Sequence, residues 1–249
     1  MHGSRAWRRI GDGPAPLNEE TRGPAGAPLA RVYEDLLRRF GPGTFNGFLH
    51  LLPPEFVATY AARLDQANDA VLARHAVFAD SENGDALAWD LDVGVGSEVL
   101  RFAPRSVEPE RLACSADALL DVLARKNLAF DQGPLRPYFV ARDGRERRPL
   151  RMRGERPSPE AMEEWLARVG KDGTELLDRT SAVDWLVVVV YVPSCDALVR
   201  VQHTGVTDGA WTFAFNAPLG TPAQTFRPFL LSGTPLGWTA EHDGTSSSR

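Results

Sequence analysis

Apolar positions at helical spacing predict two helices early in the folded part of the chain. The first runs from Leu29 to Phe40, where apolar residues recur every three or four positions until a Gly-Pro-Gly stretch ends it. The second begins near Pro54, because proline suits the first turn of a helix, and its apolar stripe falls at positions 56, 60, 64, 67 and 71. Residues 45–52 are expected to join the two helices as a short packed segment.

Short apolar runs then predict strands. Residues 76–79 and 86–89 flank the dipeptide Asn83-Gly84. This arrangement favours a β-hairpin, because both turn residues tolerate a positive φ. Residues 99–102 predict a third antiparallel strand, and Ser115 is expected to cap a helix that ends near residue 126.

A second α+β pattern follows in the last third of the chain. Ser158-Pro159 opens a predicted helix, and strands are expected at residues 185–192, 197–203 and 210–215. The sequence therefore predicts an α+β protein in which helices pack on a mostly antiparallel sheet, followed by a second small α+β unit. The two units are expected at residues 29–141 and 158–243.

Three segments lack this periodicity. Residues 1–28 are interpreted as a flexible leader, because Gly, Pro and Ala dominate from Gly11 onwards. Residues 142–157 contain seven arginines and no long apolar run, which indicates a basic, solvated linker. Residues 244–249 are expected to form a disordered tail.

Composition and charge narrow the class of protein. The chain has 249 residues, of which 43% are apolar, enough for a sizeable core. No apolar segment follows the basic start, and the longest apolar run falls far short of the ~20 residues that span a bilayer, so we expect a cytoplasmic protein without membrane contact. The net charge of -5 argues against direct nucleic-acid binding and favours a neutral or basic partner.

Spacing gives little sign of catalytic, cofactor or metal chemistry. The two cysteines lie far apart, the histidines show no metal-ligand spacing, and Gly94-Val95-Gly96 lacks the third glycine of a dinucleotide site. We therefore expect no catalytic residue, no cofactor and no metal. One alternative stays open, an enzyme that holds a divalent cation between Asp90 and Asp92, since residues i and i+2 of a strand share a face.

The most informative charge feature is a run of acids between positions 80 and 98 that no Lys or Arg interrupts. Carboxylates along one edge of the predicted hairpin would steer and dock a basic protein surface, although a solvated loop edge gives the same pattern. The candidate partner-binding residues are Asp80, Glu82, Asp85, Asp90, Asp92 and Glu98.

Three motifs in order carry a family resemblance over roughly residues 29–126. They are Phe40-Gly41-Pro42-Gly43-Thr44-Phe45-Asn46-Gly47-Phe48-Leu49, then Leu51-Leu52-Pro53-Pro54, then Asn83-Gly84-Asp85-Ala86-Leu87-Ala88-Trp89. This chain resembles the SUKH superfamily of the Smi/Knr type. The resemblance implies helices packed on a mostly antiparallel sheet and no active site.

The resemblance also implies a role. Bacterial members are often immunity proteins that bind and neutralise the toxin domain, commonly a nuclease, of a polymorphic toxin system, and fungal members regulate cell-wall synthesis through protein contacts. We therefore expect a non-catalytic protein-binding module for a basic toxin domain, with a regulatory or scaffold protein of the same superfamily as the alternative. The signature residues are expected to be structural: Gly41, Gly43, Gly47, Phe48, Asn83, Gly84, Asp85 and Trp89.

Overall fold

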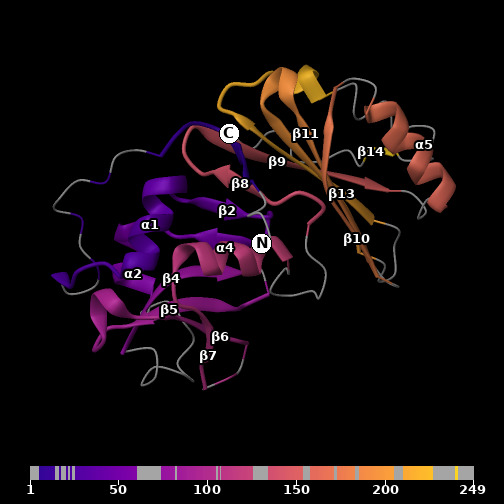
Figure 1. Ribbon diagram of the computed structural model, residues 1–249. Coiled ribbons are helices and arrows are strands. Elements are labelled where there is room, and N and C mark those ends of the chain that lie inside the picture. Colours follow the sequence, from indigo (N-terminus) through magenta and orange to yellow (C-terminus); the bar gives the residue numbers. More distant parts are fainter. Residues whose placement is uncertain are drawn as a thin grey trace, which may run out of the picture. The chain divides into compact units, whose positions relative to one another are not determined.

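The chain folds into two compact units, Met1–Asp143 and Gly144–Arg249, in the computed structural model (Figure 1). The fold class is α+β, as the sequence predicts. The boundary lies two residues beyond the end of the predicted first domain. The structure describes residues 6–14, 17, 21, 23, 26–60, 74–81, 83–104, 106, 108–125, 134–153, 158–170, 173–182, 185–204, 210–226 and 239–240.

The first unit is built on an eight-stranded sheet with the order β1-β8-β2-β3-β4-β5-β6-β7. Neighbouring strands are antiparallel except for β1 and β8, which are parallel. The predicted hairpin and third strand are confirmed as β4, β5 and β6. The strands are β1 (Arg8–Ile10), β2 (Gly43–Phe45), β3 (Leu49–Leu51), β4 (His75–Ser81), β5 (Ala86–Asp90), β6 (Val99–Phe102), β7 (Glu110–Ala113) and β8 (Tyr138–Ala141).

Three helices cover one face of this sheet: α1 (Arg31–Phe40), α2 (Pro54–Tyr60) and α4 (Ala116–Arg125) (Figure 1). Their apolar faces form one core with alternate residues of the strands, such as Leu87 and Trp89 of β5. All three helices were predicted, although positions 64, 67 and 71 of the second predicted stripe lie outside the described residues. Within the described chain, no helix is both long enough and apolar enough to cross a membrane.

Stacked aromatic rings join α1 to the centre of the sheet. Trp89 is 1% exposed, and its ring stacks on that of Tyr33 at 5.5 Å and lies 5.9 Å from that of Phe78. The Tyr33 hydroxyl donates a hydrogen bond to the Leu52 carbonyl oxygen at 2.7 Å. Because burial is nearly complete, Trp89 acts as the scaffold residue that the sequence predicted, and it has no surface to offer a partner.

Strand β2 and the turn that follows it each require one of the signature glycines. At Gly43 a Cβ atom would lie 2.3 Å from the Val140 carbonyl oxygen, so only glycine allows β2 to approach β8 this closely. Gly47 has a φ of +65°, where side chains are disfavoured. Between them Asn46 donates to the Leu123 carbonyl oxygen at 2.9 Å and accepts from the Tyr138 backbone amide at 3.1 Å, tying the turn to the end of α4 and to β8.

The predicted flexible leader is wrong for its described part. Residues Arg8–Ile10 form β1, and the side chain of Ile10 is fully buried. The Trp7 ring packs edge-on against Phe45 with ring centroids 5.2 Å apart, and Leu17 packs against the same core. The leader was misread because a three-residue strand is too short to show a period and its apolar residues lie among glycines and prolines.

The second unit is built on a six-stranded sheet with the order β10-β11-β12-β13-β9-β14. Helix α5 (Pro159–Gly170) places Met162 and Trp165 on the apolar face formed by β11, β12 and β13. The helix and these three strands were all predicted. The strands are β9 (Arg145–Arg153), β10 (Glu175–Ala182), β11 (Trp185–Val192), β12 (Ala197–Thr204), β13 (Ala210–Pro218) and β14 (Thr239–Ala240).

The predicted basic linker is also wrong, because most of it forms β9, which pairs with β13 along its whole length. The side chain of Arg145 is 2% exposed. It donates hydrogen bonds to the Asp196 carboxylate at 2.5 Å and to the Asn216 side-chain oxygen at 2.5 Å. Arg145, which the sequence predicted to be solvated, is therefore buried and paired with Asp196. Residues 154–157 and the predicted tail at 244–249 lie outside the described residues.

A buried carboxyl group in β10 makes the stability of the second unit depend on pH. Asp178 is 7% exposed, and burial raises its pKa, opposed by a 3.0 Å hydrogen bond from the Thr180 hydroxyl and by the charge of Arg200. A raised folded-state pKa means that stability falls as pH rises above the ordinary value of 3.8. In the Asp178→Asn variant, the free energy of unfolding should fall less than in wild type between about pH 4 and pH 7, as measured by hydrogen exchange in β11. Equal pH dependence in both proteins would contradict this account.

Candidate functional site

The structure separates the predicted acidic residues instead of gathering them on one edge. Asp85 is wrong as a partner-binding residue, because its side chain is only 3% exposed. One of its carboxylate oxygens accepts a hydrogen bond from Arg101 Nε at 2.9 Å, and the other accepts one from the Ser81 hydroxyl at 3.1 Å. Asp85 therefore belongs to the scaffold of the β4–β5 hairpin. This position agrees with its other predicted role, that of a structural signature residue.

Asp80 lies on β4, away from the loop that follows β5. Its Oδ1 atom is 3.3 Å from His50 Nδ1 on the neighbouring strand β3, and its side chain is 24% exposed. Glu82 lies outside the described residues. The candidate surface is thereby reduced to Asp90, Asp92 and Glu98, which lie at the end of β5 and before β6.

Arginines from neighbouring segments partly neutralise these acids. Arg74, just before β4, contacts Asp92 at 2.7 Å, and Arg111 on β7 contacts Glu98 at 3.3 Å. The side chains of Asp92 and Glu98 nevertheless remain 68% and 44% exposed. The surface therefore has mixed charge, which the uninterrupted acidic run in the sequence could not show, because both arginines lie outside that run.

Exposed apolar side chains mark the loop between β5 and β6. Val93 is 62% exposed and Val95 is 39% exposed. Among the described residues, the only other large apolar side chains with such exposure are Leu135 and Leu219. We call residues 91–98 the valine loop. The sequence did not single out these two valines, because the glycines on either side of Val95 indicate a turn and say nothing about side-chain exposure.

Hydrogen bonds fix the conformation of the valine loop. The Asp92 amide donates to the Asp90 carboxylate at 2.8 Å, and the Asp90 amide donates to the Ser97 hydroxyl at 2.9 Å. The Ser97 amide donates to the Gly94 carbonyl oxygen at 2.9 Å, closing the short 3-10 helix η4 (Gly94–Gly96). Ser97 is 5% exposed. The two valines are therefore presented by a preorganised loop.

The structure does not align the carboxylates of Asp90 and Asp92 as the alternative metal site requires. β5 ends at Asp90, so the strand face that would align the two carboxylates does not extend to Asp92. Asp90 accepts the Asp92 backbone amide, and the Asp92 carboxylate faces Arg74. Over the part of the chain that the structure describes, no three His, Cys, Asp or Glu side chains are grouped so that they could hold a metal ion.

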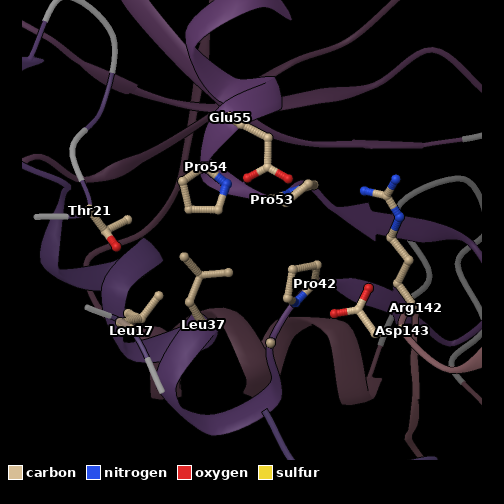
Figure 2. Close-up of a pocket in the computed structure, with 10 residues that line it drawn as sticks. Leu17, Thr21, Leu37, Pro42, Pro53, Pro54, Glu55, Arg142 and Asp143 are labelled. Atoms are coloured by element: carbon tan, nitrogen blue, oxygen red, sulfur yellow. The ribbon is translucent and has the colours of Figure 1, made fainter. Parts of the chain in front are cut away.

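A pocket of about 370 Å³ lies elsewhere in the first unit (Figure 2). Prolines and leucines form its apolar walls, and four polar side chains reach its rim. The pocket volume is at the lower end of the range for small ligands. The lining residues are Leu17, Thr21, Leu37, Gly41, Pro42, Pro53, Pro54, Glu55, Arg142 and Asp143.

The charged groups of this pocket come from two segments. Glu55 lies in the first turn of α2, whereas Arg142 and Asp143 follow β8. The Arg142 guanidinium lies 5.0 Å from the centre of the Phe56 ring, and the Arg142 amide donates to the Pro42 carbonyl oxygen at 3.0 Å. Burial raises the pKa of Tyr33, and the charge of Glu55 raises it further. None of the described lining residues is Ser, Cys, His or Lys, so the pocket offers charge recognition and no cysteine, serine or lysine nucleophile.

Comparisons with family models, with curated proteins and with solved structures each find no match to this chain. The resemblance to the SUKH superfamily therefore depends on the three motifs themselves. In the structure these motifs form the α1–β2–β3 corner, the start of α2 and the β4–β5 hairpin.

Proposed function

We propose that the chain is a non-catalytic protein-binding module, an immunity protein that binds and neutralises the toxin domain of a polymorphic toxin system. The observation that carries the proposal is the valine loop, where two exposed valines stand on a hydrogen-bonded loop beside exposed carboxylates. Inhibition of this kind needs only occlusion of the toxin's active surface.

The valine loop has the properties of an interface centre. Apolar side chains supply binding energy once a partner removes them from water, and a preformed loop loses little conformational entropy when it binds. Asp92 and Glu98 at its border favour a basic partner surface, such as the phosphate-binding face of a nuclease. A complete interface would extend beyond the loop to a total buried area of about 1,600 Å².

A regulatory or scaffold protein of the same superfamily would use such a surface equally well. Co-expression distinguishes the two roles. If the chain is an immunity protein, it should rescue cells from a toxin encoded by a neighbouring gene and should form a stoichiometric complex with that toxin. Growth arrest despite full expression of the soluble chain would rule out the immunity role and leave the regulatory one.

The Val93→Ser/Val95→Ser double variant should weaken the complex. Each serine would remove an apolar anchor without adding charge, and loss of a central contact of ~2 kcal/mol raises the Kd about 30-fold. Isothermal titration calorimetry measures this change. Leu135→Ser is the control, because the exposure of Leu135, at 55%, lies between those of the two valines and Leu135 is outside the loop. Equal affinity of the double variant and wild type would remove the valine loop from the interface.

A further inference from the structure

The pocket beside α2 carries an excess of negative charge that the proposed function has not used. Two carboxylates, Glu55 and Asp143, and one guanidinium, Arg142, line it. Within the described residues, no salt bridge joins either carboxylate to a basic side chain. The pocket therefore favours a cationic occupant.

The two carboxylates approach the cavity from different sides. Figure 2 shows the Glu55 carboxylate on the α2 side and the Asp143 carboxylate on the Pro42 side, with the Arg142 side chain next to Asp143. Arg142 is held against the Phe56 ring. A second cation can then lie between Glu55 and Asp143. There the attraction of two carboxylates opposes the repulsion of a single guanidinium, that of Arg142.

The walls suit an alkyl chain. Pro53 and Pro54 present rigid apolar surfaces on one side, and Pro42 and Leu37 of α1 lie on the other (Figure 2). Arginine and lysine bury their methylene stems on apolar surface while their charged heads stay paired or solvated. A cavity of about 370 Å³ accommodates one such side chain.

We propose that this pocket receives an arginine or lysine side chain of the protein partner. The inference depends on the proposed function, since the side chain is supplied by that partner. It adds a specific anchor site, and arginine is among the residues most enriched at the centres of interfaces.

The pocket can be tested without the partner. In a chemical-shift titration of the full chain, N-acetyl-arginine-N-methylamide should bind and perturb the signals around Pro42, Pro54 and Glu55, whereas the neutral norleucine analogue should bind at least about fivefold more weakly. Glu55→Gln and Asp143→Asn should each weaken the arginine probe by about fivefold. Asp117→Asn is the control, because Asp117 is an exposed carboxylate on α4 that contacts Arg39 and does not line the pocket.

The possible outcomes separate this inference from the proposed function. Equal binding of the neutral probe, or no effect of the two pocket variants, would overturn the pocket assignment and leave the valine loop untouched. Stronger binding of free arginine than of the blocked probe would also overturn it, in favour of a free amino acid whose carboxylate pairs with Arg142. If the probe binds as expected but the valine variants keep full partner affinity, the valine loop fails and the pocket stands.

Discussion

Replacing Trp89 by alanine is expected to lower the free energy of unfolding of the first unit by about 4 kcal/mol. The indole is 1% exposed and packs against the rings of Tyr33 and Phe78. A Cβ atom at Gly23 would lie 3.3 Å from the ring, which shows how closely the chain covers Trp89. Its removal would leave a large cavity between α1 and β5, which these neighbours could fill only if α1 moved toward the sheet.

Hydrogen exchange of the β4 and β5 amides measures this loss for the first unit alone. Trp89→Phe is the control, because phenylalanine keeps an aromatic ring between Tyr33 and Phe78 and should cost roughly half as much. A loss below ~1 kcal/mol for alanine would mean that the signature tryptophan is not a core residue. It would then have to be reconsidered as a contact residue.

The Asp85→Ala variant should lose about 3 kcal/mol, because it removes the buried carboxylate that pairs with the partly buried guanidinium of Arg101 at 2.8 Å. It also removes an acceptor of the Ser81 hydroxyl. Arg101 also contacts the exposed carboxylate of Glu110, at the longer distance of 3.4 Å. The cost should therefore appear as instability of the β4–β5 hairpin and not as a defect in partner binding.

A double-mutant cycle with Arg101→Ala tests this interpretation. The double variant should be less destabilised than the sum of the two single variants, since each single variant already removes the ion pair between the two side chains. Glu110→Ala serves as the control for an exposed contact and should cost less than ~1 kcal/mol. If Asp85→Ala keeps full stability but loses partner affinity, Asp85 belongs to the binding surface after all.

Local pattern was enough to predict helices α1, α2, α4 and α5, but only six of the fourteen strands in the described part of the chain. Positions 29–40 carry a helical period and positions 185–192 form a continuous apolar run, so α1 and β11 follow directly from the sequence. β9 was missed because its residues are mostly arginines. The burial of Arg145 depends on Asp196 and Asn216, which are distant in sequence and meet it only through sheet pairing.

The candidate site was predictable only in part, for a similar reason. An acidic run in the sequence says nothing about which arginines the neighbouring strands bring alongside it. Arg74 and Arg101 reach Asp92 and Asp85 across the sheet, so one predicted surface residue became a buried ion pair. The valine loop and the pocket depend on side-chain exposure and on long-range packing, and neither leaves a periodic signal in the sequence.

If the chain presents the valine loop to a protein partner, the loop should be covered in the complex. Hydrogen exchange can be compared between the chain alone and its purified complex with the toxin encoded by the neighbouring gene. Backbone amides of residues 91–98 should become strongly protected in the complex, while those of the second-unit strand β11 should not change. Unchanged exchange in the loop, with protection confined to other surfaces, would contradict this role of the loop.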